Sequence, residues 1–119
     1  MYGKTEWLIA DCYWPEVTTE GHYVSHEAIC VLNAGDRDAE IEITLFFEDA
    51  EPLAGFRAFC AARRTNHIRM DKIVSKDGRG VERGIPYAMT VESDVPIVVQ
   101  YSRCDTTQAE LSFMGLLAY

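Results

Sequence analysis

The sequence lacks most of the motifs by which an enzyme is recognised. It contains no P-loop, no GxGxxG, no HExxH, no nucleophile elbow and no cysteine–histidine signature. Positive charge is scarce too, since 11 Lys and Arg residues stand against 19 Asp and Glu residues and the net charge is −8. Binding to nucleic acid or to an anionic membrane surface depends on clustered positive charge, so the composition argues against both. No catalytic residue is assigned from a motif.

Signals for secretion, membrane insertion and disulfide formation are missing as well. Met1–Glu6 has neither the basic start nor the apolar stretch of a signal peptide. No apolar run approaches the roughly 20 residues of a membrane span. The four cysteines have wide, irregular spacing without a CxxC pair, which is typical of free thiols: Cys12, Cys30, Cys60 and Cys104. We therefore expect a cytoplasmic protein with no metal or other cofactor.

The sequence also lacks the periodicity of an amphipathic helix, and this absence points to an all-β fold. Short apolar or alternating runs separated by turn residues predict about eight β-strands. With 119 residues, they fit a single domain covering residues 1–119. The expected fold is all-β: an antiparallel β-sandwich or jelly-roll-like barrel. The predicted strands are Thr5–Ala10, Ala28–Leu32, Glu40–Glu48, Phe56–Ala62, Thr65–Met70, Ala88–Glu92, Val95–Tyr101 and Phe113–Tyr119.

The clearest local pattern is a pair of strands joined by a polar loop. Ala28–Leu32 is continuously apolar, which predicts a strand covered on both faces. Asn33–Asp38 supplies turn residues, and Glu40–Glu48 alternates as a half-buried strand does. We expect these strands to form a hairpin.

The remaining segments are expected to be connections. Ser93-Asp94 is predicted to be a turn, and Asp71–Ile73 a turn of helix capped by Asp71. Asp11–Tyr23 and Ser75–Gly84 are predicted to be loops, the first holding Trp14 as a candidate stacking platform. Arg103–Glu110 is predicted to be a polar loop or one helical turn.

The first polar cluster is His26-Glu27, directly before a buried strand. Neighbouring residues on a strand point to opposite faces, so the two side chains are not expected to enter one pocket. They either bond the adjacent loop or contact a ligand at the mouth of the sandwich. A metal ligand role for His26, with His22 and His67, matches no known zinc spacing.

The second and third polar clusters lie on later strands. Arg63, Thr65, His67 and Arg69 share one strand face. They either pair across strands with glutamates of Glu40–Glu48 or form a site for an anion or a polyhydroxylated ligand. Gln100–Asp105 ends the most apolar strand, where Arg103 and Asp105 either pair with each other or line a rim.

Short motifs along almost the whole chain resemble one known family. In order, they are Trp7-x-Ile9-Ala10, Ser25-His26-Glu27, Leu32-Asn33-Ala34-Gly35-Asp36, Ile41-Glu42-Ile43-Thr44, Glu51-Pro52, Ala62-Arg63-Arg64-Thr65-x-His67-x-Arg69, Val95-Pro96-Ile97-Val98-Val99-Gln100, Arg103-x-Asp105, Gln108-Ala109-Glu110 and Ala118-Tyr119. This series resembles the Anabaena sensory rhodopsin transducer family. The departures lie in Asp11–Tyr23 and Lys76–Pro86.

The resemblance implies an all-β sandwich whose founding member is a soluble cytoplasmic tetramer that couples to a membrane photoreceptor. It implies that most relatives bind small molecules, with sugars or sugar-derived metabolites as the expected class. Carried over residue by residue, the ligand-binding positions are His26, Glu27, Asn33, Arg64, His67, Arg69, Gln100, Arg103 and Asp105.

The leading hypothesis is therefore a sensory or transducer-like binding module for a small polar metabolite, which acts as a homotetramer and is not an enzyme. The second hypothesis is a protein-interaction adaptor in signal transduction. A third is a small enzyme of sugar metabolism that uses His26, Glu27 and His67 as acid, base or metal ligands. DNA binding conflicts with the negative charge.

Overall fold

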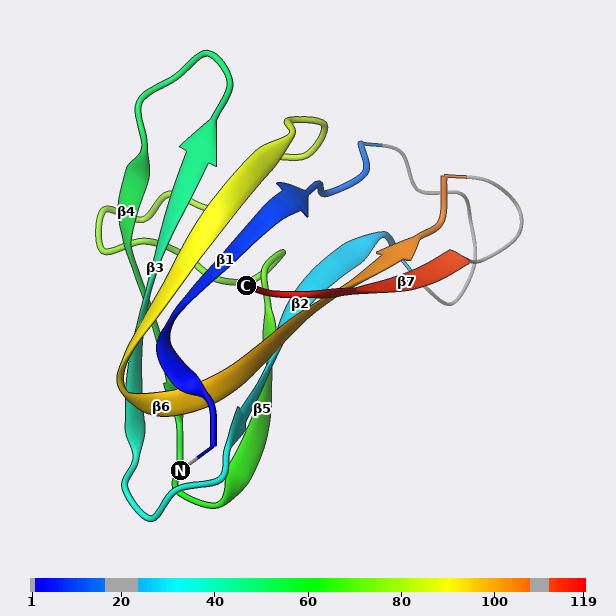
Figure 1. Cartoon of the computed structure of the whole chain (residues 1–119). Coiled ribbons are helices and arrows are strands. Elements are labelled where there is room, and N and C mark those ends of the chain that lie inside the picture. Colours follow the sequence, from blue (N-terminus) through cyan, green and yellow to red (C-terminus); the bar gives the residue numbers. More distant parts are fainter. Residues whose placement is uncertain (1, 17–23, 108–111) are drawn as a thin grey trace.

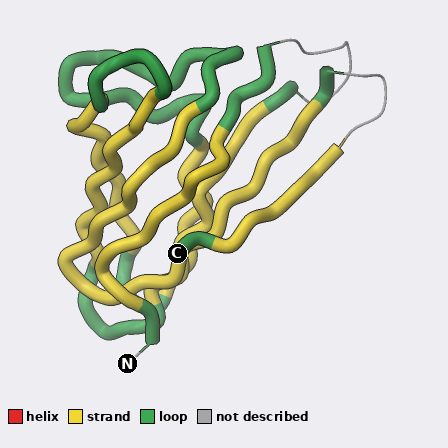
Figure 2. Tube along the Cα trace, turned by 45° about the horizontal axis from the view of Figure 1, so that its top comes forward, coloured by secondary structure: helices red, strands yellow, loops and turns green. Residues whose placement is uncertain are grey.

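Seven antiparallel strands form one curled sheet in the computed structural model, which describes residues 2–16, 24–107 and 112–119 (Figure 1). Figure 2 shows strands and loops and no helix in the described part of the chain. The expected all-β antiparallel fold is confirmed. The strands are β1 (Lys4–Cys12), β2 (His26–Asn33), β3 (Ala39–Phe47), β4 (Leu53–Cys60), β5 (Arg64–Arg69), β6 (Tyr87–Asp105) and β7 (Ser112–Leu117).

The long strand β6 belongs to both halves of the sheet. Its first half pairs with β1 and β3, and its second half pairs with β2 and β7. The strand order is β4-β3-β6-β2-β5, and Figure 1 shows β6 bending where the two halves meet. The predicted turn at Ser93-Asp94 is wrong, because both residues lie within β6. Buried apolar side chains occupy every second position from Tyr87 to Tyr101 except position 93, where the half-buried Ser93 keeps the alternation in phase.

The predicted hairpin is also wrong, although its two strands and its loop are present. β2 and β3 do not pair with each other, because β6 lies between them. The loop Asn33–Asp38 therefore connects the two halves of the sheet. Strand pairing depends on contacts distant in sequence, and here β6 supplies the partner edge for both strands.

Burial in β3 follows the predicted alternation, but burial in β2 does not. Ile43 and Leu45 of β3 are fully buried, and the glutamates between the apolar positions are exposed. In β2, Ile29 and Val31 point into the core, whereas Leu32 on the outer face is 47% exposed. The outer face is buried at Ala28, half-buried at Cys30 and exposed at Leu32, so the expectation of a strand covered on both faces is not met along its whole length.

Several predicted connections are shorter than expected, because strands extend into them. Asp11 and Cys12 belong to β1, and Arg103–Asp105 belongs to β6. Of the remaining residues of the first predicted loop, 13–16 are described, whereas 17–23 fall outside the described residues, as do Gln108–Glu110. Residues 71–73 follow β5 as a turn without a helix, and Asp71 pairs with Arg69 at 2.7 Å instead of capping a helix.

The edges of the curled sheet are partly closed by backbone contacts. Tyr119 and Leu8 exchange two backbone hydrogen bonds, which bring the C-terminal residues beside β1. On the opposite side, Ser75 pairs with Phe56 of β4. These contacts give the sandwich its barrel-like form. None of the described residues builds a helix long and apolar enough to cross a membrane.

A row of like charges crosses the outer face of the sheet and gives the first testable prediction. Glu92 of β6 lies directly opposite Glu6 of β1 and Glu42 of β3, and all three are exposed. Like charges in opposed positions destabilise a sheet by about 0.2–1 kcal/mol per pair. We expect Glu92→Gln to raise the free energy of unfolding by a similar amount in urea denaturation at low salt, and by less at high salt. Glu51→Gln, outside the row, is the control, and an equal gain in both variants would contradict the interpretation.

Candidate functional site

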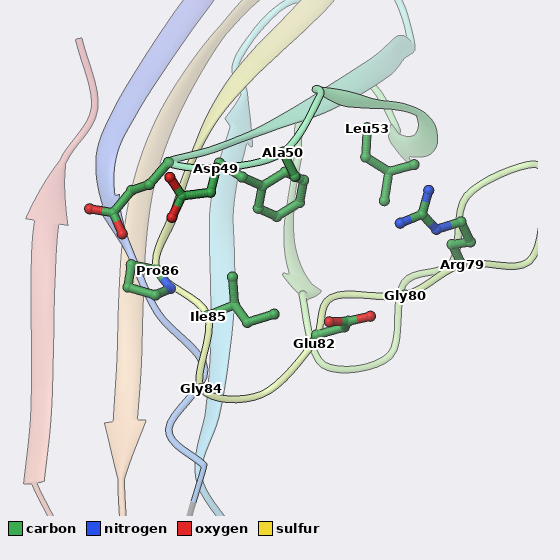
Figure 3. Close-up of a pocket in the computed structure, with 11 residues that line it drawn as sticks. Asp49, Ala50, Leu53, Arg79, Gly80, Glu82, Gly84, Ile85 and Pro86 are labelled. Atoms are coloured by element: carbon green, nitrogen blue, oxygen red, sulfur yellow. The ribbon is translucent and has the colours of Figure 1, made fainter.

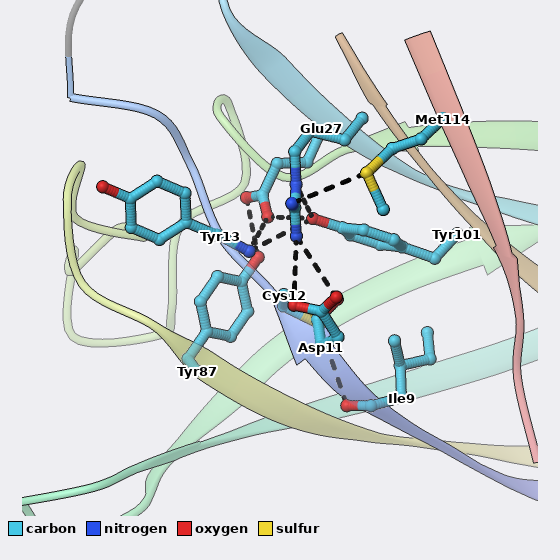
Figure 4. A network of polar contacts seen from close by, with 9 residues as sticks. Ile9, Asp11, Cys12, Tyr13, Glu27, Tyr87, Tyr101 and Met114 are labelled. Carbon is cyan, nitrogen blue, oxygen red and sulfur yellow. Dashed lines mark hydrogen bonds and ion pairs between the residues drawn. The ribbon is translucent and has the colours of Figure 1, made fainter. Parts of the chain in front are cut away.

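A buried carboxylate, Glu27, lies at the centre of a polar network between the two halves of the sheet (Figure 4). Its position on the inner face of β2, opposite Arg103, buries the side chain completely. Oε2 accepts a hydrogen bond from the Tyr87 hydroxyl at 2.7 Å. Oε1 accepts hydrogen bonds from the Tyr101 hydroxyl at 2.5 Å and from the Tyr13 backbone N–H at 3.0 Å. The carboxylate thus connects β2 with both halves of β6 and with the segment after β1.

Burial determines the protonation of the groups in this network. It raises the pKa of Glu27 above its ordinary value of 4.5, while the hydrogen bonds from Tyr101 and Tyr87 and the charge of Arg103 oppose that rise. Burial and the neighbouring Glu27 raise the pKa of both tyrosines, so both phenols stay protonated and donate. Burial also raises the pKa of Cys12, which keeps this thiol in its unreactive form.

Arg103 connects the buried carboxylate with the rim of the sandwich. Its Nε donates to the Tyr101 hydroxyl at 3.3 Å, and Nη2 lies 3.5 Å from the carboxylate of Asp11, whose side chain is 70% exposed. The guanidinium carbon is 5.9 Å from the ring centroid of Tyr13, within the range of a cation–π contact. Nη1 lies 3.7 Å from the sulfur of Met114 on β7. The network therefore extends from the core to β7.

The alternative in which Arg103 pairs with Asp105 is wrong. Arg103 pairs with Asp11, and the Asp105 carboxylate accepts the Thr107 backbone N–H at 2.9 Å.

Four other predicted ligand positions lie on the outer face of the sheet. His26 points away from Glu27, as strand geometry predicts, and its Nδ1 lies 2.8 Å from the carbonyl oxygen of Val24. The others occupy outward register positions on β5 and β6, beside Cys30 and Ala28: His67, Arg69 and Gln100. The alternative in which the basic cluster pairs with the β3 glutamates is wrong, because β5 pairs with β2.

Asn33 and Arg64 lie at the opposite end of β2, far along the strand from Glu27. Asn33 is fully buried, and its Nδ2 donates to the carbonyls of Arg37 at 2.8 Å and Cys60 at 3.1 Å. Its Oδ1 accepts the Gly35 N–H at 3.1 Å, so this side chain fixes the 33–38 loop. Arg64 is exposed. Of the nine predicted positions, only Glu27 and Arg103 share the buried network.

The described residues do not form a metal site. Within 2–16, 24–107 and 112–119, no group of three His, Cys, Asp or Glu side chains is arranged to hold a metal ion. His22, one of the alternative metal ligands, lies outside these ranges.

An open cleft of about 340 Å³ lies between the turn after β3 and the segment before β6 (Figure 3). Its apolar part includes Phe47, Leu53, Ile85 and Pro86, and its polar part includes Glu48, Asp49, Arg79 and Glu82. None of the nine predicted ligand positions lines it. The only signals in the sequence are the turn residues on both sides, which predict loops but do not predict that two loops face each other.

Residues 13–16 connect this cleft with the Glu27 network, and we call them the 13–16 segment. The Trp14 carbonyl accepts the N–H of Gly84, a residue of the cleft wall, at 2.8 Å. Arg83 Nη1 donates to the Pro15 carbonyl at 3.1 Å, and its guanidinium carbon lies 4.2 Å from the Trp14 ring centroid. Trp14 Nε1 donates to the Ser25 carbonyl at 2.7 Å. Trp14 is thus a stacking platform for an arginine of the same chain.

These features define a small all-β sandwich domain with a buried carboxylate–tyrosine–arginine network. The model of the family described as Anabaena sensory rhodopsin transducer matches residues 2–119, and the chain belongs to this family. The resemblance found in the sequence is therefore confirmed, and the chain is a transducer-like β domain.

Two solved structures are similar to the chain over most of its length. The crystal structure of Thermotoga maritima 1070 has 34% sequence identity and a TM-score of 0.88, and the match covers 100% of this chain and 96% of that one. The Anabaena sensory rhodopsin transducer has 41% sequence identity and a TM-score of 0.77, and the match covers 91% of this chain and 94% of that one. No curated protein matches the sequence.

The raised pKa of Glu27 predicts a specific dependence of stability on pH. The folded state binds this proton more tightly than the unfolded state, so its contribution to the free energy of unfolding is present at low pH and is lost as pH rises from 4.5 through the raised folded pKa. The slope is at most about 1.4 kcal/mol per pH unit. We expect Glu27→Gln to remove this part of the slope in urea denaturation from about pH 4 to about pH 8. Glu51→Gln, which removes an exposed carboxylate, is the control, and an unchanged slope in Glu27→Gln would contradict the assignment.

Proposed function

We propose that this protein is a sensory, transducer-like binding module that recognises a small polar metabolite and does not transform it. We further propose that its one domain works as a homotetramer in the cytoplasm. The proposed ligand class is a sugar or a sugar-derived metabolite.

The observation that carries this proposal is the cleft between the turn after β3 and the segment before β6. Its volume of about 340 Å³ is within the range of small-molecule sites, about 300–1,000 Å³. Carboxylates and Arg79 supply acceptors and donors at its rim, while Phe47 and Leu53 supply apolar surface. A polyhydroxylated ring needs both kinds of contact, because it presents hydroxyl groups at its edge and C–H groups on its faces.

The chemistry of the Glu27 network supports a role without catalysis. Three donors already occupy the oxygens of this carboxyl group. The two tyrosines and Cys12 are held protonated by the rise in their pKa values. Neither an activated nucleophile nor an accessible general base results from this arrangement.

A protein-interaction adaptor is the second candidate, and β7 favours it. This strand carries no charged side chain, and Phe113 and Leu117 are 64% and 65% exposed. Exposed apolar side chains grouped on one strand are typical of a contact surface. The relative named a sensory rhodopsin transducer is consistent with such a partner.

Thermal-shift measurements with neutral sugars, sugar acids and sugar phosphates test the proposal. We expect at least one compound at millimolar concentration to raise Tm, because a ligand at about 100 times its Kd stabilises the folded state by about 2.7 kcal/mol. We expect Arg79→Ala to weaken that binding about tenfold or more, since a hydrogen bond to a charged group contributes about 1.5–3 kcal/mol.

Lys76→Ala is the matched control, because it removes a positive charge from the same segment outside the cleft lining. No stabilisation by any compound, together with a stoichiometric protein partner in a pull-down experiment, would favour the adaptor instead. Size-exclusion chromatography with light scattering tests the proposed tetramer separately.

A further inference from the structure

The cleft and the Glu27 carboxyl group share the same stretch of chain. Gly84, Ile85 and Pro86 line the cleft, and Tyr87 follows them directly. The hydroxyl of Tyr87 donates to Glu27 at 2.7 Å. A displacement of the cleft wall at Pro86 would therefore be passed to the next residue, Tyr87, which donates a hydrogen bond to the buried carboxyl group.

The 13–16 segment provides a second connection between the same two sites. At one end, the Tyr13 N–H lies 3.0 Å from Glu27 Oε1 and 3.2 Å from the Tyr101 hydroxyl. At the other end, the segment is held against the cleft wall by the bond from Gly84 and by Arg83, which stacks on the Trp14 ring. The segment cannot leave the cleft wall without disturbing the surroundings of Glu27.

We propose that the 13–16 segment couples the position of the cleft wall to the protonation of Glu27, so that ligand binding in the cleft and proton binding at Glu27 favour each other. This inference rests on the proposed function, in which the cleft holds the ligand. With the 13–16 segment closed, water is excluded from Glu27, and burial, the largest cause of its raised pKa, favours the neutral carboxyl group; the Tyr13 N–H, which favours the ionised form, offsets only part of this effect. A ligand that holds the cleft wall against the segment favours the closed state, and by reciprocity proton binding then strengthens ligand binding.

Among the described residues, the titratable and charged groups that face Glu27 come from β1 and β6. They are Cys12 on β1, and Tyr87, Tyr101 and Arg103 on β6, while Asp11 of β1 contacts Arg103 at the rim. Arg103 favours the ionised form of Glu27. Because Arg103 also contacts Asp11 at the rim and Met114 on β7, a change in the charge of Glu27 would alter these outer contacts. Arg83 is not one of these groups, so a substitution of Arg83 removes none of them.

The test measures the titration of Glu27 by NMR in ligand-free protein with isotope-labelled glutamate side chains, and Glu27→Gln assigns the signal. We expect Arg83→Ala to lower the midpoint by about one pH unit, because loosening the 13–16 segment admits water and burial is the largest cause of the raised pKa. Arg83→Lys keeps the charge but loses the planar stacking group, so we expect a shift in the same direction. Lys76→Ala removes a positive charge from the same stretch before β6 as Arg83, and it is expected to leave the midpoint unchanged.

A midpoint that stays constant or rises in Arg83→Ala would overturn the inference. An equal fall in Lys76→Ala would overturn it too, because the effect would then not depend on the contact of Arg83 with the 13–16 segment; loss of a positive charge alone would raise the midpoint. Circular dichroism verifies that each variant is folded, and Arg83→Lys provides the decisive result should Arg83→Ala not fold. Because no ligand is present, this result is independent of the thermal-shift screen: failure of the screen refutes the binding function, whereas failure of the titration refutes the coupling.

Discussion

The pairing of one buried carboxyl group with two tyrosines on the two halves of β6 is the interaction on which this structure depends. A carboxylate removed from water costs several kcal/mol unless donors replace its hydration. Tyr87, Tyr101 and the Tyr13 backbone supply these donors from three places in the chain. Glu27 is therefore satisfied only when β6 is bent as observed and residue 13 lies across the end of the sheet. A buried polar group with such requirements disfavours alternative packings of the same apolar strands.

The same arrangement gives the domain a path from its interior to its surface. Arg103 bonds Tyr101 on the inner side and reaches Asp11 and Met114 on the outer side. On the other flank, the Tyr13 N–H and the Tyr87 hydroxyl lead to the wall of the cleft. A transducer-like domain needs a connection of this kind, because an event at one site must alter contacts at another.

Local patterns in the sequence were sufficient for the fold class but not for the strand pairing. The period of two in β3 depends only on which positions are apolar, so it predicted the strand and its buried face correctly. Ser93 and Asp94 have turn propensity, and this local preference outweighed the alternation of buried positions in β6, which runs from Tyr87 to Tyr101 with Ser93 as its one polar member. The separation of β2 from β3 depends on contacts distant in sequence, which periodicity does not encode.

The candidate site was predictable only in part. The opposite orientations of His26 and Glu27 follow from strand geometry, and they are observed. Tyr87 and Tyr101 were missed, because a tyrosine in an apolar strand looks like any core aromatic residue until a buried carboxylate lies within reach of its hydroxyl. The cleft was missed because it forms where two loops meet, and loop composition does not determine which loops become neighbours.

A double-mutant cycle of Tyr87→Phe and Tyr101→Phe tests the central claim most directly. Both hydroxyls bond the same carboxyl group, so we expect the free energies of unfolding of the two variants to be coupled by about 0.5–3 kcal/mol. We expect this coupling to disappear in the Glu27→Gln background. Additive effects, within about 0.3–0.5 kcal/mol, would show that the two halves of β6 are not joined through Glu27 and would contradict this account.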